Sequence, residues 1–208
     1  MTPHPLFDNY GVTITREEAL SALQLDSEKS YLLFFGFIRA YKGLDLLIKA
    51  FADKRLRKKK LKLIIAGEFY EDDTPYRQLI KLYGLENDVI IRDHFIKDNE
   101  VSLYFSVADL VVQPYKSATQ SGVTQIAFHY EKPMLVTDVG GLSEIVEDRV
   151  CGYVVPPIPE DIAEAIIDYF ENTRQEQFSE GVRREKEKFS WDKMTGSIIE
   201  VYNKCLIL

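Results

Sequence analysis

Short apolar runs alternate with amphipathic segments along most of the chain. Six of the runs have the length of β-strands and are rich in branched and aromatic side chains. They are Tyr31–Gly36, Leu61–Ala66, Val89–Ile91, Asp109–Gln113, Met134–Thr137 and Gly152–Val155. Because runs that are apolar throughout are typical of strands buried on both faces, the pattern predicts a parallel sheet of about six strands with helices on each side.

Segments with helical periodicity separate these runs. The predicted helices are Gly43–Ala52, Pro75–Tyr83, Asn99–Val107, Ser121–Tyr130 and Leu142–Val146. Each fits a strand–helix–strand crossover, so we expect a Rossmann-like, doubly wound α/β fold. The prolines of Pro156–Pro159 then break the pattern, and a C-terminal helical extension follows, with Ser190 as the N-cap of its last helix. Its predicted helices are Glu160–Phe170, Gln175–Lys188 and Trp191–Leu206.

The length and composition fit one large domain. The chain has 208 residues, of which 46% are hydrophobic, and this is enough for a substantial core but short for two ordinary domains. Residues 1–14 begin with Thr2–Pro5, a proline-stiffened stretch that is typical of a linker. We therefore expect an extended lead-in over 1–14, a domain over 15–190 and a final helix over 191–208.

The charge pattern excludes some partners and leaves one question open. A net charge of −7 argues against a general affinity for nucleic acid. The basic run Lys54–Lys60 is the exception. It fits either a solvated helix end and loop or a surface that touches anionic lipid or a partner.

Cysteine usage and the apolar runs indicate a cellular location. Cys151 and Cys205 are the two cysteines, and their spacing indicates neither a disulfide framework nor a zinc site. No apolar run approaches the roughly 20 residues that span a bilayer, and the N-terminus lacks a signal-peptide pattern. We expect a cytoplasmic protein.

Three strand-to-helix loops carry candidate chemistry, because doubly wound folds bind ligands at the carboxyl ends of strands. Gly36–Gly43 places Arg39 and Lys42 at a helix N-terminus, where an anion such as phosphate would compensate two cations; the alternative is that both face water. Lys116–Gln125 offers hydroxyls, an amide and a glycine, which suit a diphosphate or simply cap a helix. Asp138–Glu144 is the third loop.

Metal ligands and histidines give weaker signals. Glu71–Asp73 is the tight acidic run near a strand end, and no His or Cys lies close in sequence to complete a site, so we predict a solvated loop without a metal. His129 falls within a predicted helix and fits a packing or surface position. His94 fits a ligand contact or an ordinary loop position equally well.

Taken in order, these elements resemble a known family. The chain is similar to the C-terminal domain of the group 1 glycosyltransferases (family GT4, GT-B fold), and the likeness covers nearly all of it. The matching stretches are Phe35–Gly36, Lys42–Gly43 with Leu46 and Phe51, Ile64–Glu68, Ala108–Pro114, Lys132–Val146, Gly152–Pro157 and Phe189–Trp191.

The resemblance implies a donor-binding domain. Such a domain binds a nucleotide-diphosphate sugar, while a separate N-terminal domain, not in this chain, binds a glycan or lipid-linked acceptor. The sugar is transferred with retention and without a metal or other cofactor, and the isolated domain is expected to be inactive. The last helix would cross back to the N-terminal domain, with peripheral contact at the inner face of a membrane as a further expectation.

The resemblance also assigns residues. Arg39 and Lys42 are the predicted catalytic residues, because they would neutralise charge on the departing phosphate. The predicted donor-binding residues are Gly36, Gly43, His94, Phe95, Ile96, Thr119, Gln120, Ser121, Gly122, Val123 and Thr124.

Three departures from the family pattern keep other functions open. The family's two glutamates of the second loop are replaced by Ala118 and Ile126, and Phe37 stands where a cation often follows the glycine. Ser117, with neighbouring polar residues, would have to substitute. A degenerate domain that binds a nucleotide or a partner is therefore an alternative, as is a GT-B epimerase or phosphorylase.

Overall fold

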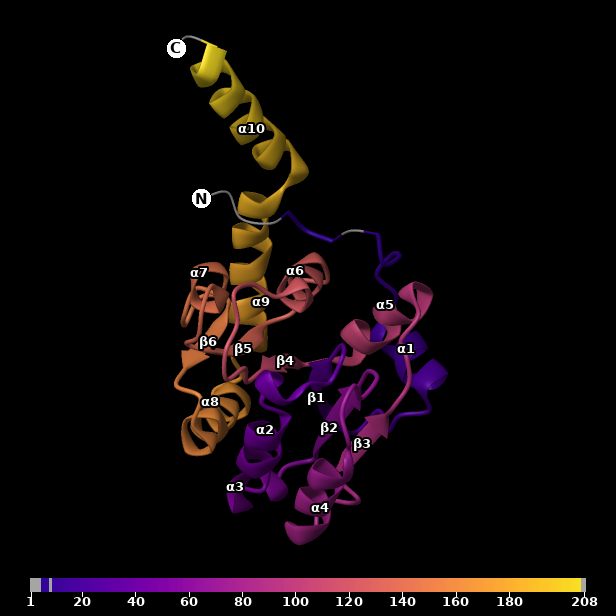
Figure 1. The fold of residues 1–208 in the computed structure, drawn as a ribbon. Coiled ribbons are helices and arrows are strands. Elements are labelled where there is room, and N and C mark those ends of the chain that lie inside the picture. Colours follow the sequence, from indigo (N-terminus) through magenta and orange to yellow (C-terminus); the bar gives the residue numbers. More distant parts are fainter. Residues whose placement is uncertain (1–4, 8, 207–208) are drawn as a thin grey trace.

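The fold is a single parallel sheet enclosed by helices (Figure 1). A computed structural model of the chain describes residues 5–7 and 9–206, with side chains as far as 204. Thr2, Pro3 and His4 of the predicted linker lie outside the described residues, as does the side chain of Cys205. The strands are β1 (Ser30–Phe35), β2 (Leu61–Ala66), β3 (Val89–Arg92), β4 (Leu110–Gln113), β5 (Met134–Thr137) and β6 (Gly152–Val155).

All six strands pair in parallel in the order β3-β2-β1-β4-β5-β6. The predicted fold class is confirmed, and the predicted strand bounds differ from the observed ones by at most one residue. The order reverses between β1 and β4, which are neighbours in the sheet although β2 and β3 separate them in sequence. In doubly wound sheets this reversal opens a crevice at the carboxyl ends of the strands.

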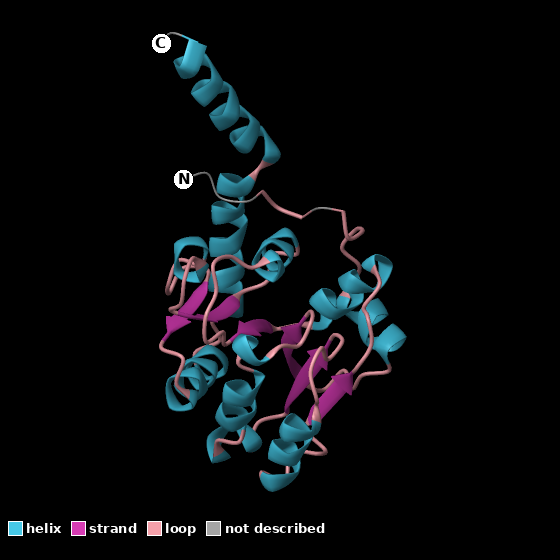
Figure 2. Ribbon diagram, in the orientation of Figure 1, coloured by secondary structure: helices cyan, strands magenta, loops and turns pink. Residues whose placement is uncertain are grey.

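Helices cover both faces of the sheet (Figure 2), as the crossover pattern requires. One face carries α2, α3, α4 and α8, and the other carries α1, α5, α6, α7 and α9. Their bounds are α1 Arg16–Leu23, α2 Leu44–Phe51, α3 Lys54–Arg57, α4 Thr74–Leu82, α5 Asp98–Val107, α6 Gly122–His129, α7 Leu142–Ile145, α8 Pro159–Glu171, α9 Gln175–Glu185 and α10 Trp191–Leu206, with short 3-10 turns η1 (Ala40–Lys42) and η2 (Lys186–Phe189).

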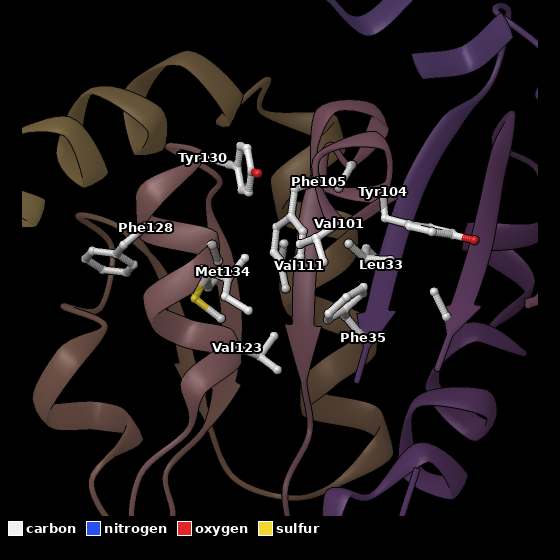
Figure 3. Close-up of a cluster of buried hydrophobic side chains, with 14 of the residues drawn as sticks. Leu33, Phe35, Val101, Tyr104, Phe105, Val111, Val123, Phe128, Tyr130 and Met134 are labelled. Carbon is white, nitrogen blue, oxygen red and sulfur yellow. The ribbon is translucent and has the colours of Figure 1, made fainter. Parts of the chain in front are cut away.

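The core lies on both faces of the sheet because successive side chains of a strand point in opposite directions. In β1, Leu33 and Phe35 join the cluster under α5 and α6, which Figure 3 shows, while Leu32 and Phe34 join the cluster under α2 and α8. This two-sided burial explains why β1 is apolar along its whole length.

Helix α1 was not predicted. It begins at a capping box in which Thr15 accepts from the Glu18 N–H and the Glu18 carboxylate accepts from the Thr15 N–H. Only two of its residues are buried, so it lacks a clear apolar stripe. Arg16 ties it to the domain through an ion pair with Asp109 at 3.1 Å.

Half of the cations in the basic run form ion pairs. Its first half forms α3, and Arg55 pairs with Asp53 at 2.8 Å and with Glu164 at 2.5 Å. Lys59 and Lys60 also have carboxylate partners. The run is therefore more than a solvated helix end, because half of its six cations bind acidic residues of the same chain.

Helix α10 projects away from the rest of the molecule (Figure 1). Ser190 caps it as predicted, because its Oγ accepts from the Lys193 N–H at 3.3 Å. No helix within the described part of the chain is long and apolar enough to cross a bilayer. The exposed apolar side chains of α10 are Trp191, Ile198, Ile199, Val201 and Tyr202.

Candidate functional site

The loops after β1, β2 and β4 meet at the point where the strand order reverses. Close backbone approaches hold them together: a Cβ atom at Gly67 would lie 2.1 Å from the Gly36 carbonyl oxygen, and one at Gly43 would lie 1.9 Å from that of Pro114. Gly43 also has a φ of +70°, which favours glycine. The predicted donor residue Gly43 thus joins two loops and is not among the residues that line the two hollows described next.

Two adjoining hollows open at this edge of the sheet. The β2–β3 hollow, about 140 Å³, lies at the ends of β2 and β3, and the α6 hollow, about 280 Å³, lies at the start of α6. The two share lining residues, so they form one continuous cleft. The shared residues are Tyr10, Phe35, Gly36, Phe37 and Ile126.

Lys42 is the buried cation of this cleft. Its side chain lines the α6 hollow, is 8% exposed, and places Nζ 5.7 Å from the Tyr115 ring centre. No hydrogen bond or ion pair reaches its ammonium from the described residues. Burial, with a smaller contribution from Arg39, lowers the pKa of Lys42 to about 8. An unpaired buried cation of this kind is a candidate anion site.

Arg39 takes a different position. Its guanidinium stands 4.8 Å from the ring centre of Tyr70, and it is not among the residues that line either hollow. Tyr70 in turn packs against Phe37 with ring centres 4.7 Å apart. The structure therefore places one predicted catalytic cation in the cleft and the other at its exposed rim.

The polar side chains of the β4–α6 loop bind one another. Gln113 donates to Ser121 Oγ at 2.7 Å and to Tyr115 Oη at 3.1 Å, and Thr124 Oγ1 donates to Gln113 Oε1 at 2.9 Å. Thr124 is fully buried, and its N–H donates to the Ser121 carbonyl. The hydroxyl and the N–H of Thr124, a predicted donor contact, are both engaged inside the protein.

The start of α6 still faces the cleft through Gly122 and Val123, which line the α6 hollow together with Gln120 and Ser121. First-turn N–H groups of a helix have no partners within the helix, so they are available to an anion. The lead-in crosses this point: a Cβ atom at Gly122 would lie 2.8 Å from the Phe7 ring.

Phe7 and Tyr10 line the cleft although sequence reasoning treated them as linker. Two hydrogen bonds anchor their segment, one from the Leu6 N–H to the Phe189 carbonyl at 3.0 Å and one from Tyr130 Oη to the Tyr10 carbonyl at 2.8 Å. The aromatic side chains of residues 1–14 were the sequence feature that could have indicated packing against the domain.

The β5–α7 loop packs closely against the backbone of the β4–α6 loop. Gly140 has a φ of +55°, and a Cβ atom there would lie 1.6 Å from the Ala118 carbonyl oxygen. The Gly141 N–H donates to the Thr119 carbonyl at 3.0 Å. This close approach explains the glycine pair, and Thr119 is not among the residues that line the two hollows.

At the end of β3, Phe95 and Ile96 line the β2–β3 hollow, whereas His94 is exposed outside it. His129 packs edge-on against Tyr130 with ring centres 4.7 Å apart, which fits the predicted packing role. Within the acidic run, Asp72 accepts from Thr74 at 2.6 Å. Among residues 5–7 and 9–206, no three His, Cys, Asp or Glu side chains gather in a way that could hold a metal ion.

Comparison with known proteins identifies the family. The family model of the glycosyl transferases group 1 matches residues 15–185, so the chain belongs to this family. Spore coat protein SA of Bacillus subtilis (strain 168) is 26% identical over 98% of this chain and 56% of its own length. The chain thus spans about half the length of the curated relatives it matches.

Solved structures show the same fold. Sucrose-phosphate synthase from Thermosynechococcus elongatus superposes with a TM-score of 0.81 over 99% of this chain and 52% of that one, at 20% identity. HepE of Anabaena, in complex with UDP and glucose, superposes with a TM-score of 0.75 over 91% of this chain and 52% of that one, at 21% identity. The resemblance inferred from the sequence is confirmed at the level of family and fold.

Proposed function

We propose that the chain is the donor-binding half of a retaining glycosyltransferase, which moves a sugar from a nucleotide-diphosphate sugar to a glycan or lipid-linked acceptor. The observation that carries the proposal is the buried ammonium of Lys42, which faces the α6 hollow without an anionic partner among the described residues. Burial of an unpaired charge costs free energy, and an anionic ligand would offset that cost. A diphosphate suits the site because the N-terminus of α6 opens on the same hollow.

The proposed chemistry needs charge neutralisation more than a side-chain base. When the bond between the anomeric carbon and the phosphate oxygen breaks, negative charge develops on the diphosphate. Lys42 and the N–H groups of Gly122 and Val123 would stabilise that charge, with Arg39 acting from the rim. The acceptor would attack from the face that the diphosphate leaves, and these cations would make a metal ion unnecessary.

The nucleotide would extend from the α6 hollow into the β2–β3 hollow. There Phe95 and Ile96 offer an apolar wall for the base. The complex of HepE with UDP and glucose supports a nucleotide-sugar donor for this family, although that protein is only 21% identical.

The proposed partner of this chain is a second domain. Because the chain spans about half of its relatives, we propose that an N-terminal domain completes it and that the exposed apolar side chains of α10 pack against that domain. We propose a cytoplasmic location. Peripheral contact with anionic lipid would use Lys54 and Lys58, for which the described residues supply no ion-pair partner.

A second candidate function is a degenerate domain that binds a nucleotide or a partner without catalysis. Two observations favour it. Ile126 lines both hollows at a position where the family commonly has a carboxylate, and Phe7 covers Gly122 at the start of α6. The two functions differ in whether a sugar is transferred, and a degenerate domain that binds only a partner would also lack a working diphosphate site.

Calorimetric titration of the chain with UDP, GDP, ADP and CDP tests this site. We expect one or more of them to bind, and Lys42→Met to weaken that binding about thirtyfold, which corresponds to about 2 kcal/mol. Lys49→Met is the matched control, because Lys49 is an exposed cation of α2 that pairs with Asp45. Equal losses in both variants, or no binding at all, would contradict the proposal.

A further inference from the structure

Glu68 lies two residues after the end of β2, and backbone hydrogen bonds hold it in place. The Ile38 N–H donates to the Glu68 carbonyl at 2.8 Å, and the Tyr70 N–H donates to the Ile38 carbonyl at 3.1 Å. An isolated parallel bridge between Ile38 and Phe69 continues the same pairing. The backbone of β1 and β2 therefore stays paired beyond the sheet and fixes the position from which the Glu68 side chain projects.

Glu68 is exposed, and it is one of the residues that line the β2–β3 hollow, whose other walls include Phe37, Phe95 and Ile96. The described residues give this carboxylate neither a hydrogen bond nor an ion pair. A carboxylate without an internal partner beside an apolar wall is free to accept hydrogen bonds from a ligand. This group takes no part in the charge neutralisation described above.

Asp98 is the other carboxylate of the hollow, and it has a structural explanation. It lies in the first turn of α5, where the helix dipole favours a negative charge. Burial raises the pKa of Tyr10, and the charge of Asp98 adds to this effect, so Asp98 lies close to the lead-in. The dipole of α5 thus favours a carboxylate at Asp98, whereas Glu68 lies outside any helix.

The order of subsites along the cleft indicates what Glu68 would meet. A nucleoside diphosphate places its ribose between the phosphates and the base. The two hollows meet at Gly36, against which Gly67 packs, and Glu68 is the next residue. Among the side chains that line both hollows, those of Phe35, Phe37 and Ile126 cannot accept a hydrogen bond, and Tyr10 offers a neutral hydroxyl. In doubly wound dinucleotide-binding folds an acidic residue after the second strand takes a ribose hydroxyl.

We propose that Glu68 accepts hydrogen bonds from the ribose diol of the bound nucleotide and so selects ribonucleotides over their 2′-deoxy forms. The inference rests on the proposed function, because it requires a nucleotide in the cleft. It assigns the ribose to the end of β2, whereas α6 presents Ile126 at that junction.

The test compares UDP, GDP, ADP and CDP with their 2′-deoxy forms by calorimetric titration. For each nucleotide that binds, we expect the ribose form to bind about tenfold more tightly, since a hydrogen bond to a charged group contributes about that factor. Glu68→Ala should bring the ratio close to one, and Glu68→Gln should give an intermediate ratio. Asp98→Asn is the matched control and should keep the full ratio.

The outcomes separate this inference from the function on which it rests. If Glu68→Ala still binds a nucleoside diphosphate and keeps the full preference for ribose, the inference is overturned and the donor site stands. If Asp98→Asn abolishes the preference instead, the inference is also overturned. If none of the four nucleotides binds the unmodified chain, the proposed function fails and the inference fails with it. A thermal melt of each variant confirms folding.

Discussion

The loops after β1 and β4 both carry groups that could bind phosphate, but their buried polar groups are paired differently. The β1–α2 loop buries Lys42 and gives its ammonium no partner among the described residues. The β4–α6 loop buries Ser121 and Thr124 and joins both to Gln113. Both loops are rich in groups that could bind phosphate. Among the described residues, the first leaves a buried charge, the Lys42 ammonium, without a partner, whereas the second leaves a neutral group, the buried amide of Gln125, without one.

The difference separates groups that bind a ligand from groups that hold the site in shape. A buried polar group that is already hydrogen-bonded gains little from a ligand, whereas an unpaired charge gains a great deal. The β4–α6 loop therefore contributes its backbone N–H groups and its rigidity, while the β1–α2 loop contributes charge. Variants of the two loops should then move stability and affinity in different directions.

The largest effect should come from Gln113→Leu. This change leaves the hydroxyls of Ser121, Thr124 and Tyr115 without their shared partner, so we expect the free energy of unfolding to fall by about 3 kcal/mol. Urea denaturation measures it, with Thr124→Val as a smaller step of about 1 kcal/mol. A loss from Gln113→Leu no larger than that from Thr124→Val would mean that the four side chains do not act as one network.

Lys42→Met should have the opposite effect on stability. The pKa of Lys42 is about 8 in the folded chain against 10.5 for a free lysine, so the charged form is disfavoured by folding. Below pH 8 the folded state bears the full penalty, and stability returns as the pH rises from 8 towards 10.5. We expect the ligand-free variant to be more stable by about 2 kcal/mol at pH 7.

Denaturation of the unmodified chain and of Lys42→Met at pH 7 and pH 10 tests whether the variant is the more stable of the two. The difference in their free energies of unfolding should be smaller at pH 10, because Lys42 in the folded unmodified chain has lost its proton at that pH. Lys132, whose pKa burial also lowers to about 8, is present in both proteins and cancels in the comparison. A Lys42→Met variant that is less stable at pH 7 would show that the ammonium has a stabilising partner.

The smallest effect should come from Arg39→Ala. Because Arg39 stands over Tyr70 at the rim and is exposed, solvent screens its charge, and we expect nucleoside-diphosphate affinity to fall about threefold to tenfold. Stability should change by less than about 0.5 kcal/mol. A loss of affinity as large as that of Lys42→Met would place Arg39 inside the cleft beside the phosphates.

The fold could be read from the sequence because its signals are local. Strand and helix positions followed from apolar runs and their periods, and Pro133–Glu144 with the surrounding motifs indicated the family. Helix α1 was not predicted because only two of its residues, Ala19 and Leu20, are buried, so the apolar pattern is weak although a capping box marks its start. The ion pair between Arg16 and Asp109, two residues that lie 93 positions apart in the sequence, anchors this helix to the domain.

The candidate site could be predicted only in part. The sequence alone determined which loops carry chemistry: Gly36–Gly43 and Lys116–Gln125 both follow strands of a doubly wound sheet. Tertiary structure decided which side chains are free to act, namely that Lys42 is unpaired, that Thr124 is engaged and that Phe7 covers Gly122. The physical reason is that element type follows from neighbours in sequence, whereas burial and pairing depend on contacts between segments that only packing brings together.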